Sequence, residues 1–530
     1  MVMQQQHSRS RNLHNLDRGG AYYGPLAAAP LMTESEEFMT KHRRIGIIGG
    51  LGMLAGADVH AKLLCAGQRA AVPFDALYEQ HRFDGDDRGG VDQPDLNGRK
   101  LYIFNLMKRF ELARVDSVML PCFISHTFLH ELQTELPLPI LNIMDALLAH
   151  LKQHASGAVR LGVLTSTYVR RKKMFETYFN SRQYQVLYPR KDLQDGCVMP
   201  AVYGPHGLQA GGARAEVARH LLQACADLIA QGADVIIPGA TEIAILADEL
   251  SNACGTLVVD TNQAYAEYAL EHSQRPPPHA FKIGIIGGIG PAATVDFMNK
   301  IIHNTAARTD QDHIKLVVEH NPQIPDRTAN LIAEGEDPTI AIYAACKRLE
   351  ANQVDLIAIP CNTAHAYVER ILPYLEVPIV NMLVETVLHI RQYYPERTVV
   401  GLLATAGTVA SRVYHDAAKE APFQLIVPDQ AHQALVTNAI YGDTGVKAGF
   451  VEGRCKDELM LALEHLVRRG ATLVILGCTE LPLLIGQSID FQVAGCSIAV
   501  LDPTDLLARR CIRLAQAGTV PAGQPGLPLR

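Results

Sequence analysis

Two cysteines in this sequence each end a short apolar run, and both could act as an acid or a base. Cys361 follows residues 356–360, and Cys478 follows residues 473–477. Such runs are typical of buried strands, and the carboxyl end of a strand is where α/β sheets bind ligands. A thiol there, close to the start of a helix, loses its proton more easily. The two sulfurs could face each other across a cleft, or both could be buried structural cysteines.

Composition limits the classes of protein that need to be considered. The chain has 530 residues, of which 48% are hydrophobic and 19% are charged, which is enough for several packed domains. The net charge of −7 gives no electrostatic case for a nucleic-acid partner. The 11 cysteines form no CxxC pair, so we expect no metal site and free thiols in a reducing, cytoplasmic compartment.

The two ends of the chain have the composition of unstructured segments. Residues 1–42 are rich in Gln, Ser, Arg and Asn, and Gly24 and two prolines interrupt their one apolar patch. That patch is neither a signal-peptide core nor a membrane span, so we expect no membrane partner. We predict a disordered arm over residues 1–42 and a tail over residues 517–530.

A repeat with a nearly constant offset divides the chain. Its landmarks are a glycine-rich turn, a cysteine after a strand, and a Thr-Glu pair. The matching residues lie 238, 239 and 238 positions apart and are Gly46 and Gly284, Cys122 and Cys361, and Glu242 and Glu480. This pattern indicates a tandem duplication. We predict copy 1 over residues 43–273, a proline-rich linker over residues 274–280, and copy 2 over residues 281–516.

Apolar runs alternate with helical patterns within copy 2. Strands are expected at residues 283–286, 314–319, 356–359, 399–403 and 473–476. Helices are expected between them, for example at residues 293–305 and 338–351. Continuous β-branched runs that alternate with helices indicate parallel sheets covered on both faces. Because the two cysteines fall in different series of strands, we predict an α/β fold with two Rossmann-like lobes per copy and an active-site cleft between them.

The glycine-rich turn of copy 2 matches a dinucleotide-binding motif, G-x-G-x-x-A, from Gly288 through Gly290 to Ala293. The acid on the next strand, Glu319, lies 31 residues beyond the first glycine of the match, whereas the motif expects about 20. We therefore favour a tight turn whose backbone approaches a small substrate over a site for NAD.

Five motifs run through copy 2 in a fixed order. They are Gly287-Gly288-Ile289-Gly290-Pro291, residues 322–328, Cys361-Asn362-Thr363-Ala364-His365, residues 441–449, and Gly477-Cys478-Thr479-Glu480. Together they resemble the aspartate/glutamate racemase family, and most closely the aspartate racemases that work without pyridoxal phosphate. Glu480 resembles the aspartate branch, because glutamate racemases usually carry His there. The resemblance implies an enzyme that needs no cofactor.

The resemblance also implies the reaction, which is racemisation of L- and D-aspartate, or of glutamate or a related amino acid. A base on one face of Cα removes the proton, and an acid on the other face supplies one. Cys361 and Cys478 would serve as this thiolate and thiol, and would exchange roles in the reverse direction. A thiol with a reference pKa of about 8.5 can serve in both roles once its pKa is tuned.

Further residues are expected to hold the substrate, again by resemblance. Arg327 and Lys447 would bind the carboxylates of a dicarboxylic amino acid, although either alone could be an exposed surface cation. Hydrogen bonds or close backbone contacts are expected from Asn362, Thr363, Thr479, Gly288 and Gly290. The three polar side chains could instead cap helices. We interpret His365 as a packing residue or as support for the site.

Copy 1 departs from this pattern at chemical positions. Cys122 remains, but Ala240 stands in place of the second cysteine and Gln209 in place of the lysine. Arg88 is a possible counterpart of Arg327. One thiol cannot run a two-base reaction, so we predict that copy 1 is catalytically silent, although it could bind a ligand. Because racemases of this family commonly form homodimers, we expect the copies to pair as an intramolecular pseudo-dimer, possibly within a larger homo-oligomer.

Two other functions are compatible with the sequence. One is a different isomerase or a decarboxylase of the same superfamily that acts on a small carboxylic acid. The other is an amino-acid-binding protein without activity, which the changes in copy 1 suggest. The preferred amino acid, the enantiomer served by each cysteine, the role of copy 1 and the oligomeric state stay open.

Overall fold

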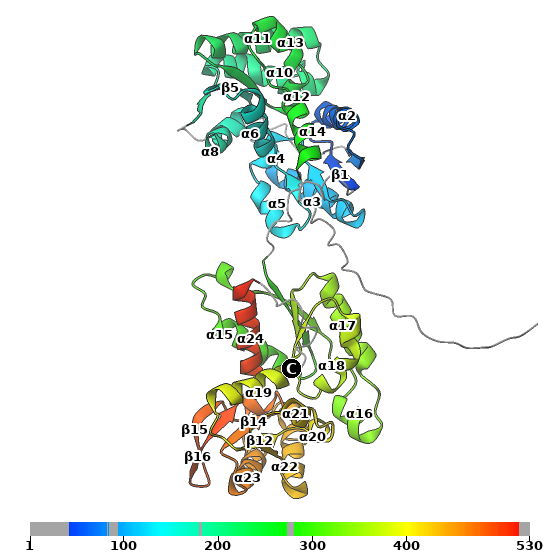
Figure 1. The fold of residues 1–530 in the computed structure, drawn as a ribbon, viewed down its shortest axis with the longest axis vertical. Helices are drawn as coiled ribbons and strands as arrows, with labels where there is room; N and C mark the ends of the chain where they lie inside the picture. The colour runs from blue at the N-terminus through cyan, green and yellow to red at the C-terminus, as the bar shows by residue number, and fades with distance from the viewer. Residues whose placement is uncertain (1–41, 82, 84–93, 180–182, 273–279, 519–530) are drawn as a thin grey trace, which may run out of the picture. The chain divides into compact units, whose positions relative to one another are not determined.

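The computed structural model describes residues 42–81, 83, 94–179, 183–272 and 280–518 (Figure 1). Nearly all of the predicted arm, linker and tail lies outside these residues, as does Arg88, whereas Ala517, predicted as the first residue of the tail, ends the last helix. The chain divides into two compact units, Met1–Pro278 and His279–Arg530, which contain copy 1 and copy 2. Among the described helices, none is both long enough and apolar enough to cross a lipid bilayer.

The first sheet of unit 2 is parallel and has the strand order β11-β10-β8-β9. Its strands are β8 (Lys282–Gly287), β9 (Lys315–His320), β10 (Leu356–Ala358) and β11 (Ile379–Val380). Successive side chains of β8 point to opposite faces, as the period of a strand requires. Ile285 packs with Phe297 on one face, and Ile286 packs with Ile342 on the other. Both faces are thus covered, which explains the continuous apolar runs of the sequence.

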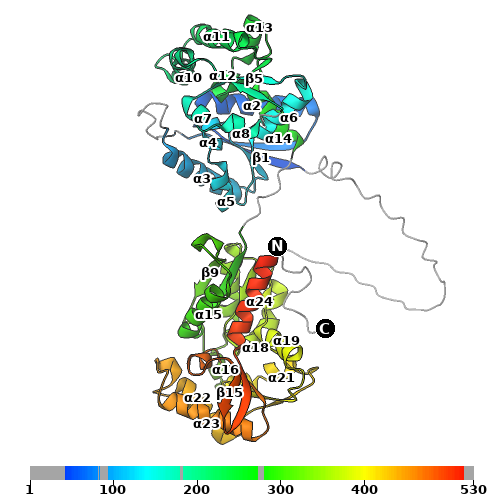
Figure 2. The same cartoon turned by 90° about the vertical axis from the view of Figure 1, so that its left-hand side faces the viewer.

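Helices cover the two faces of this sheet. On one face lie α15 (Pro291–Asn304) and α24 (Pro503–Ala517), which run side by side in Figure 2. On the other face lie α17 (Thr339–Ala351) and the short α18 (His365–Ile371). The strands and helices predicted for copy 2 occur within about two residues of their expected positions. The helix expected close to Cys361 is α18, which begins at His365, about one turn after the cysteine.

The second sheet of unit 2 has the order β13-β12-β14-β16-β15. Its strands are β12 (Val399–Leu403), β13 (Gln424–Ile426), β14 (Leu473–Leu476), β15 (Ser488–Val493) and β16 (Cys496–Leu501). Four strands are parallel, but β15 runs antiparallel to β16. Ala494 and Gly495 connect them with φ angles of 51° and 72°, the left-handed backbone that two-residue hairpins need. The α/β class is therefore confirmed, with one antiparallel edge strand that the repeat pattern did not predict.

Unit 1 repeats this plan with two parallel sheets. The orders are β2-β1-β3-β4 and β6-β5-β7. The strands are β1 (Arg43–Ile48), β2 (Phe74–Glu79), β3 (Ser117–Met119), β4 (Ile140–Leu141), β5 (Arg160–Thr165), β6 (Gln185–Leu187) and β7 (Val235–Gly239). Beyond β7 the described chain forms a single bridge between Ile236 and Val258, where unit 2 has the strand β16. The tandem duplication seen in the sequence is thus also a duplication of topology.

In each unit, one lysine forms ion pairs with two aspartates, one on its own helix and one that caps a helix far along the chain. In unit 2, Lys300 on α15 pairs with Asp296 one turn earlier and, at 2.5 Å, with Asp502, which caps the last helix. In unit 1, Lys62 on α2 (Met53–Ala70) lies 2.7 Å from both Asp58 and Asp260, and Asp260 caps α14 (Thr261–Glu271). The same kind of ionic cluster therefore joins α2 to α14 in unit 1 and α15 to α24 in unit 2.

Candidate active site

A small cavity with about 280 Å³ of empty space lies at the carboxyl ends of β8, β10, β12 and β14 in unit 2. Both sheets of the unit contribute to its wall, as expected for a site between two lobes. Seven of the nine residues predicted to act on or hold the substrate line it. These seven are Arg327, Cys361, Asn362, Thr363, Lys447, Cys478 and Thr479. The sequence therefore identified residues, up to 152 positions apart, that the fold brings to one place.

Gly288 and Gly290 form the turn behind this wall and do not line the cavity. A Cβ atom on Gly290 would lie 2.4 Å from Oε1 of Glu480, and the φ of Gly290 is +113°. A Cβ atom on Gly288, where φ is +85°, would lie 2.5 Å from the backbone of Asn321. Both positions thus require glycine. The close approach that Gly290 permits is to the carboxylate of Glu480.

Cys478 faces a carboxylate. Its Sγ donates a hydrogen bond of 3.0 Å to Oε2 of Glu480, and both residues are buried. Burial raises the pKa of Cys478 well above its ordinary value, Glu480 raises it further, and Lys447 opposes the rise. Burial and the Glu480 carboxylate therefore hold Cys478 as a protonated thiol.

Lys447 shares this carboxylate. Its Nζ lies 2.6 Å from Oε1 of Glu480. Burial alone would lower the pKa of Lys447, but Glu480 and then Cys478 raise it above its usual range, so the ammonium stays charged. Thr479 donates a 3.4 Å hydrogen bond from its hydroxyl to the same carboxylate. Glu480 thus organises three of the predicted residues, although the sequence argument used it only as a landmark of the repeat and a mark of the aspartate branch.

Cys361 lies beside a guanidinium instead. Arg327 begins the short helix α16 (Arg327–Ala333) and is 8% exposed. Burial tends to lower the pKa of Arg327, but the neighbouring charge and hydrogen bond of Cys361, together with Asp326, raise it. Its Nη1 donates to the carbonyl oxygens of Ile324 and Pro325, at 3.2 and 2.9 Å, which fixes the side chain. The two sulfurs of the cavity therefore have neighbours of opposite charge.

Two buried donors in this wall have no acceptor among the described residues. They are Nε of Arg327 and Nδ2 of Asn362. The other end of the Asn362 amide is engaged, because its Oδ1 accepts a 2.7 Å hydrogen bond from Tyr414. Leaving a buried donor unpaired costs about 1–3 kcal/mol. A ligand that carries only acceptors at this point, such as a carboxylate, would satisfy both donors.

Hydroxyl groups join the two lobes around the cavity. Thr363, which follows β10, lies 3.1 Å from Oγ1 of Thr405, which follows β12. Thr328 donates to Thr405 at 3.3 Å and accepts from Tyr441 at 3.2 Å. Burial raises the pKa of Tyr441 to about 12, so its phenol stays protonated. Thr405 was missed from the sequence, because its place in the site depends on a hydrogen bond between the lobes.

His365 hydrogen-bonds to the loop that contains Cys361 and does not line the cavity. Its Nε2 accepts a 3.4 Å hydrogen bond from the backbone N–H of Met382, so Nδ1 carries the proton that it donates to the Cys361 carbonyl at 2.9 Å. Burial lowers the pKa of His365 to about 4, and the imidazole is neutral. This geometry is that of a residue that positions the loop.

Unit 1 has a corresponding cavity, with about 330 Å³ of empty space, lined by Cys122, Gln209 and Ala240 among others. The cation beside its cysteine is Arg99, whose Nη1 lies 3.6 Å from Sγ of Cys122. Arg99 belongs to α3 (Leu96–Leu112), and the repeat offset pairs it with Pro338, so the duplication gave no signal for it. A guanidinium thus stands beside the first cysteine of both units, but on different elements.

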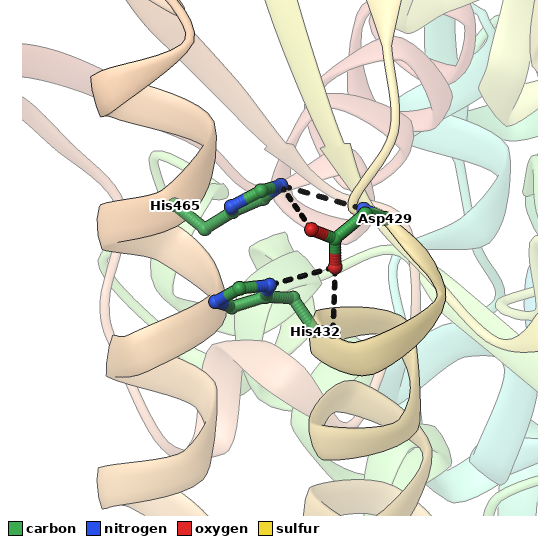
Figure 3. A group of neighbouring side chains, drawn as sticks. All are labelled: Asp429, His432 and His465. Atoms are coloured by element: carbon green, nitrogen blue, oxygen red, sulfur yellow. Dashed lines mark hydrogen bonds and ion pairs between the residues drawn. The ribbon is translucent and has the colours of Figure 1, made fainter.

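The described part of the chain contains one group of side chains with the chemistry of metal ligands, Asp429, His432 and His465 (Figure 3). None of them lines either cavity. Asp429 caps α22 (Gln430–Tyr441) and lies 2.7 Å from Nδ1 of His432. The ring of His432 stacks on that of His465, from α23 (Arg454–Arg468), at 3.8 Å and 13°. These contacts join α22 to α23 at the surface.

The chain was compared with known proteins. The family model described as Asp/Glu/Hydantoin racemase matches residues 48–269 and again residues 286–511. The broad specificity amino-acid racemase RacX of Bacillus subtilis is 31% identical over 159 residues, 29% of this chain and 67% of that protein. A glutamate racemase of Methylococcus capsulatus is 30% identical over 162 residues, 30% of this chain and 56% of that protein. Among solved structures, the aspartate racemase of Picrophilus torridus is 30% identical, with a TM-score of 0.39, and the match covers 44% of this chain and 94% of that one.

Proposed function

This chain belongs to the Asp/Glu/hydantoin racemase family, and from that premise we propose that unit 2 is a cofactor-independent amino-acid racemase. Its proposed substrate is aspartate, or glutamate or a related acidic amino acid. The observation that carries the proposal is one cavity lined by two cysteines, Cys361 and Cys478, and two cations, Arg327 and Lys447. Such a cavity supplies both bases and both anion-binding groups that the reaction needs.

The neighbours of the two sulfurs suggest the resting state. Cys361, beside Arg327, is the thiolate that takes the α-proton. Cys478, whose thiol is held by Glu480, is the acid that delivers a proton to the opposite face of Cα. After one turnover, Cys361 is protonated and Cys478 is a thiolate next to the Glu480 carboxylate. Lys447 lies close enough to offset that repulsion, and the reverse reaction restores the first state.

The two cations of the cavity favour an acidic substrate. Arg327 and Lys447 offer one positive group for each of its carboxylates, and the Glu480 carboxylate and the proposed Cys361 thiolate balance their charge in the empty cavity. A dicarboxylic amino acid carries a net negative charge at neutral pH. We place its α-carboxylate on the unpaired donors of Arg327 and Asn362, where bound positive charge lowers the cost of the carbanion.

The proposal is tested by incubating the full chain with L-aspartate, L-glutamate or L-alanine in D₂O. Chiral chromatography measures the D form, and nuclear magnetic resonance measures deuterium at Cα. We expect racemisation with Cα exchange, faster for an acidic amino acid than for alanine. Loss of a carboxylate would identify a decarboxylase instead. Binding without exchange in any substrate would contradict the proposal and favour a non-enzymatic binding protein.

A further inference from the structure

The cavity of unit 1 has lost half of the catalytic groups but has kept buried charge. Arg99 and Glu242 both line it, and they are 3% and 6% exposed. Burying an ionised side chain costs several kcal/mol unless other groups compensate. A cavity with only a structural role would be more stable when filled by apolar side chains. Gln209 and Thr241 hydrogen-bond to Glu242, and Arg99 lies beside Cys122. Both charged groups line the cavity that corresponds to the proposed substrate cavity of unit 2, where one cation and one anion would match a zwitterionic ligand.

The charge of this cavity differs from that of unit 2 in one respect. Where unit 2 pairs Glu480 with Lys447, unit 1 has Gln209, whose Nε2 donates a 2.7 Å hydrogen bond to Oε1 of Glu242. An amide supplies a hydrogen bond but no positive charge. The carboxylate of Glu242 thus keeps its negative charge toward the cavity, and the described lining holds one guanidinium and one carboxylate.

The wall beside the cysteine has also become apolar. Phe123 and Ile124 follow Cys122, whereas Asn362 and Thr363 follow the cysteine of unit 2. Phe123 stacks on Phe175, with ring centroids 5.7 Å apart. Phe123 and Ile124 line the cavity, and both are buried. This wall offers an apolar surface where unit 2 offers hydrogen bonds.

From these three features we infer that unit 1 binds a small zwitterionic α-amino acid with an uncharged side chain and does not turn it over. The carboxylate lies against Arg99, the ammonium against Glu242, and the side chain against Phe123 and Ile124. Among the described lining residues, Arg99 is the single cation, so a second carboxylate on the ligand would meet Glu242 and aspartate is expected to bind more weakly. This inference concerns unit 1 alone and holds whether or not unit 2 is a racemase.

The test is equilibrium dialysis of the full chain with radiolabelled L- and D-alanine and L-valine. The Arg327→Gln background removes the cation on which we place the α-carboxylate in unit 2, so that binding of an amino acid there is weakened. We expect saturable binding of one neutral amino acid per chain, and at least tenfold weaker competition by aspartate. No saturable binding of any of these amino acids, or equal competition by aspartate, would overturn the inference.

Three further substitutions locate the site in the same background. Arg99→Gln and Glu242→Gln are each expected to weaken alanine binding at least tenfold. Gln209→Lys restores the lysine of unit 2, so it fits the fold; it is expected to weaken alanine binding and to admit aspartate. Thermal melts confirm that each variant is folded. Unchanged alanine binding in folded Glu242→Gln, or in Gln209→Lys, would show that the ammonium does not lie where we place it.

Discussion

At the scale of single residues, the two cysteines of the unit 2 cavity have different electrostatic surroundings. Cys478 donates its proton toward a carboxylate, whereas Cys361 lies beside a guanidinium. A symmetric pair would have no preferred resting state. In the proposed mechanism, Cys478 begins as the thiol, and its conversion to the thiolate beside Glu480 is unfavourable. The two directions of the reaction are therefore expected to differ in the pH dependence of their rates.

Cys361→Ala and Cys478→Ala are each expected to abolish racemisation, because one base remains and it reaches one face of Cα. Each variant is expected to retain exchange of the α-proton with D₂O in one enantiomer only, and in opposite enantiomers for the two variants. Chiral analysis with nuclear magnetic resonance measures both effects. Cys496→Ala, at an exposed cysteine, serves as the control and is expected to keep full activity. Near-normal racemisation in either alanine variant would rule out the two-thiol mechanism.

Arg327→Gln and Lys447→Gln are each expected to lower kcat/KM for aspartate by roughly 2–4 kcal/mol of transition-state stabilisation. Each removes a positive charge that meets the substrate, and Lys447→Gln also removes the group that opposes the high pKa of Cys478. Steady-state kinetics with both enantiomers measures the effect. Lys456→Gln removes an exposed lysine paired with Glu452 and is the matched control. Normal turnover in both site variants would show that these cations have another role.

Residue identity was predicted where the sequence carried a repeated motif and missed where contact depends on the fold. Cys361 and Cys478 stood at the ends of recognisable strands. Arg99 did not, because it reaches Cys122 from a helix whose counterpart in copy 2 begins near a proline. Thr405 enters the site through a hydrogen bond between lobes, and no local pattern records such a bond.

At the scale of elements, a buried histidine contacts the loop of Cys361 and another contacts the loop of Cys122, and both are expected to make stability depend on pH. Burial lowers the pKa of His365, and of His126 in unit 1, to about 4. The unfolded chain binds protons with a pKa of about 6.5, so stability falls as the pH drops from about 6.5 toward 4. For His365 the expected loss is about 2–3 kcal/mol at pH 4.5. Thermal melts of the full chain at pH 7 and pH 4.5 measure it.

The variant His365→Gln isolates this contribution. It removes the titrating group, so its own stability at pH 7 is expected to be lower but to decline less on acidification. His432→Gln, at a histidine that is partly exposed, is the comparison. An equal decline in wild type and His365→Gln would show that this imidazole does not control the acid response.

The ion pairs of Lys300 with Asp296 and Asp502 are also expected to stabilise the packing of two helices. Lys300→Gln leaves Asp502, with 3% side-chain exposure, without its counter-ion. Loss of one partner of a buried pair is strongly destabilising, and we expect about 3 kcal/mol here. Lys456→Gln breaks an exposed pair and is expected to cost less than about 1 kcal/mol. Urea unfolding followed by circular dichroism compares the free energies of unfolding of the two variants. A similar loss in both would contradict a stabilising role for the ion pairs of Lys300.

Elements were predictable to the extent that they were buried on both faces. The strands β8, β10, β12 and β14 are continuous apolar runs and stand out in the sequence. The edge strand β15 has an irregular pattern of burial, and its pairing depends on a hairpin turn rather than on a crossover helix. It therefore gave no signal of the kind that identified the parallel strands.

At the scale of the whole molecule, the constant offset of the repeat predicted two copies, and the structure has two compact units. How the copies associate stays a prediction. If they pair as a pseudo-dimer, residues 281–530 expressed alone expose an apolar face. We expect this fragment to form dimers or to lose solubility, and to melt at a lower temperature than the full chain.

Light scattering after size-exclusion chromatography measures the oligomeric state of the fragment, and thermal melts and kinetics measure its stability and activity against the full chain. The companion variant Cys122→Ala in the full chain is expected to keep racemase activity, since unit 1 has no second thiol. A fragment that is monomeric, equally stable and equally active would contradict a stabilising role for copy 1. Loss of activity in Cys122→Ala would show that unit 1 takes part in the chemistry.

The hydrogen bond between Cys478 and Glu480 also bears on oxidative damage. Peroxide attacks the thiolate and not the thiol, so a cysteine held protonated resists conversion to sulfenic acid. Cys478 is shielded in this way, whereas Cys361, as the proposed resting thiolate, is not. Oxidative inactivation would then begin at one sulfur of the pair. A bound substrate that covers Cys361 would slow that oxidation, so we expect peroxide to inactivate the protein more slowly in the presence of substrate than in its absence.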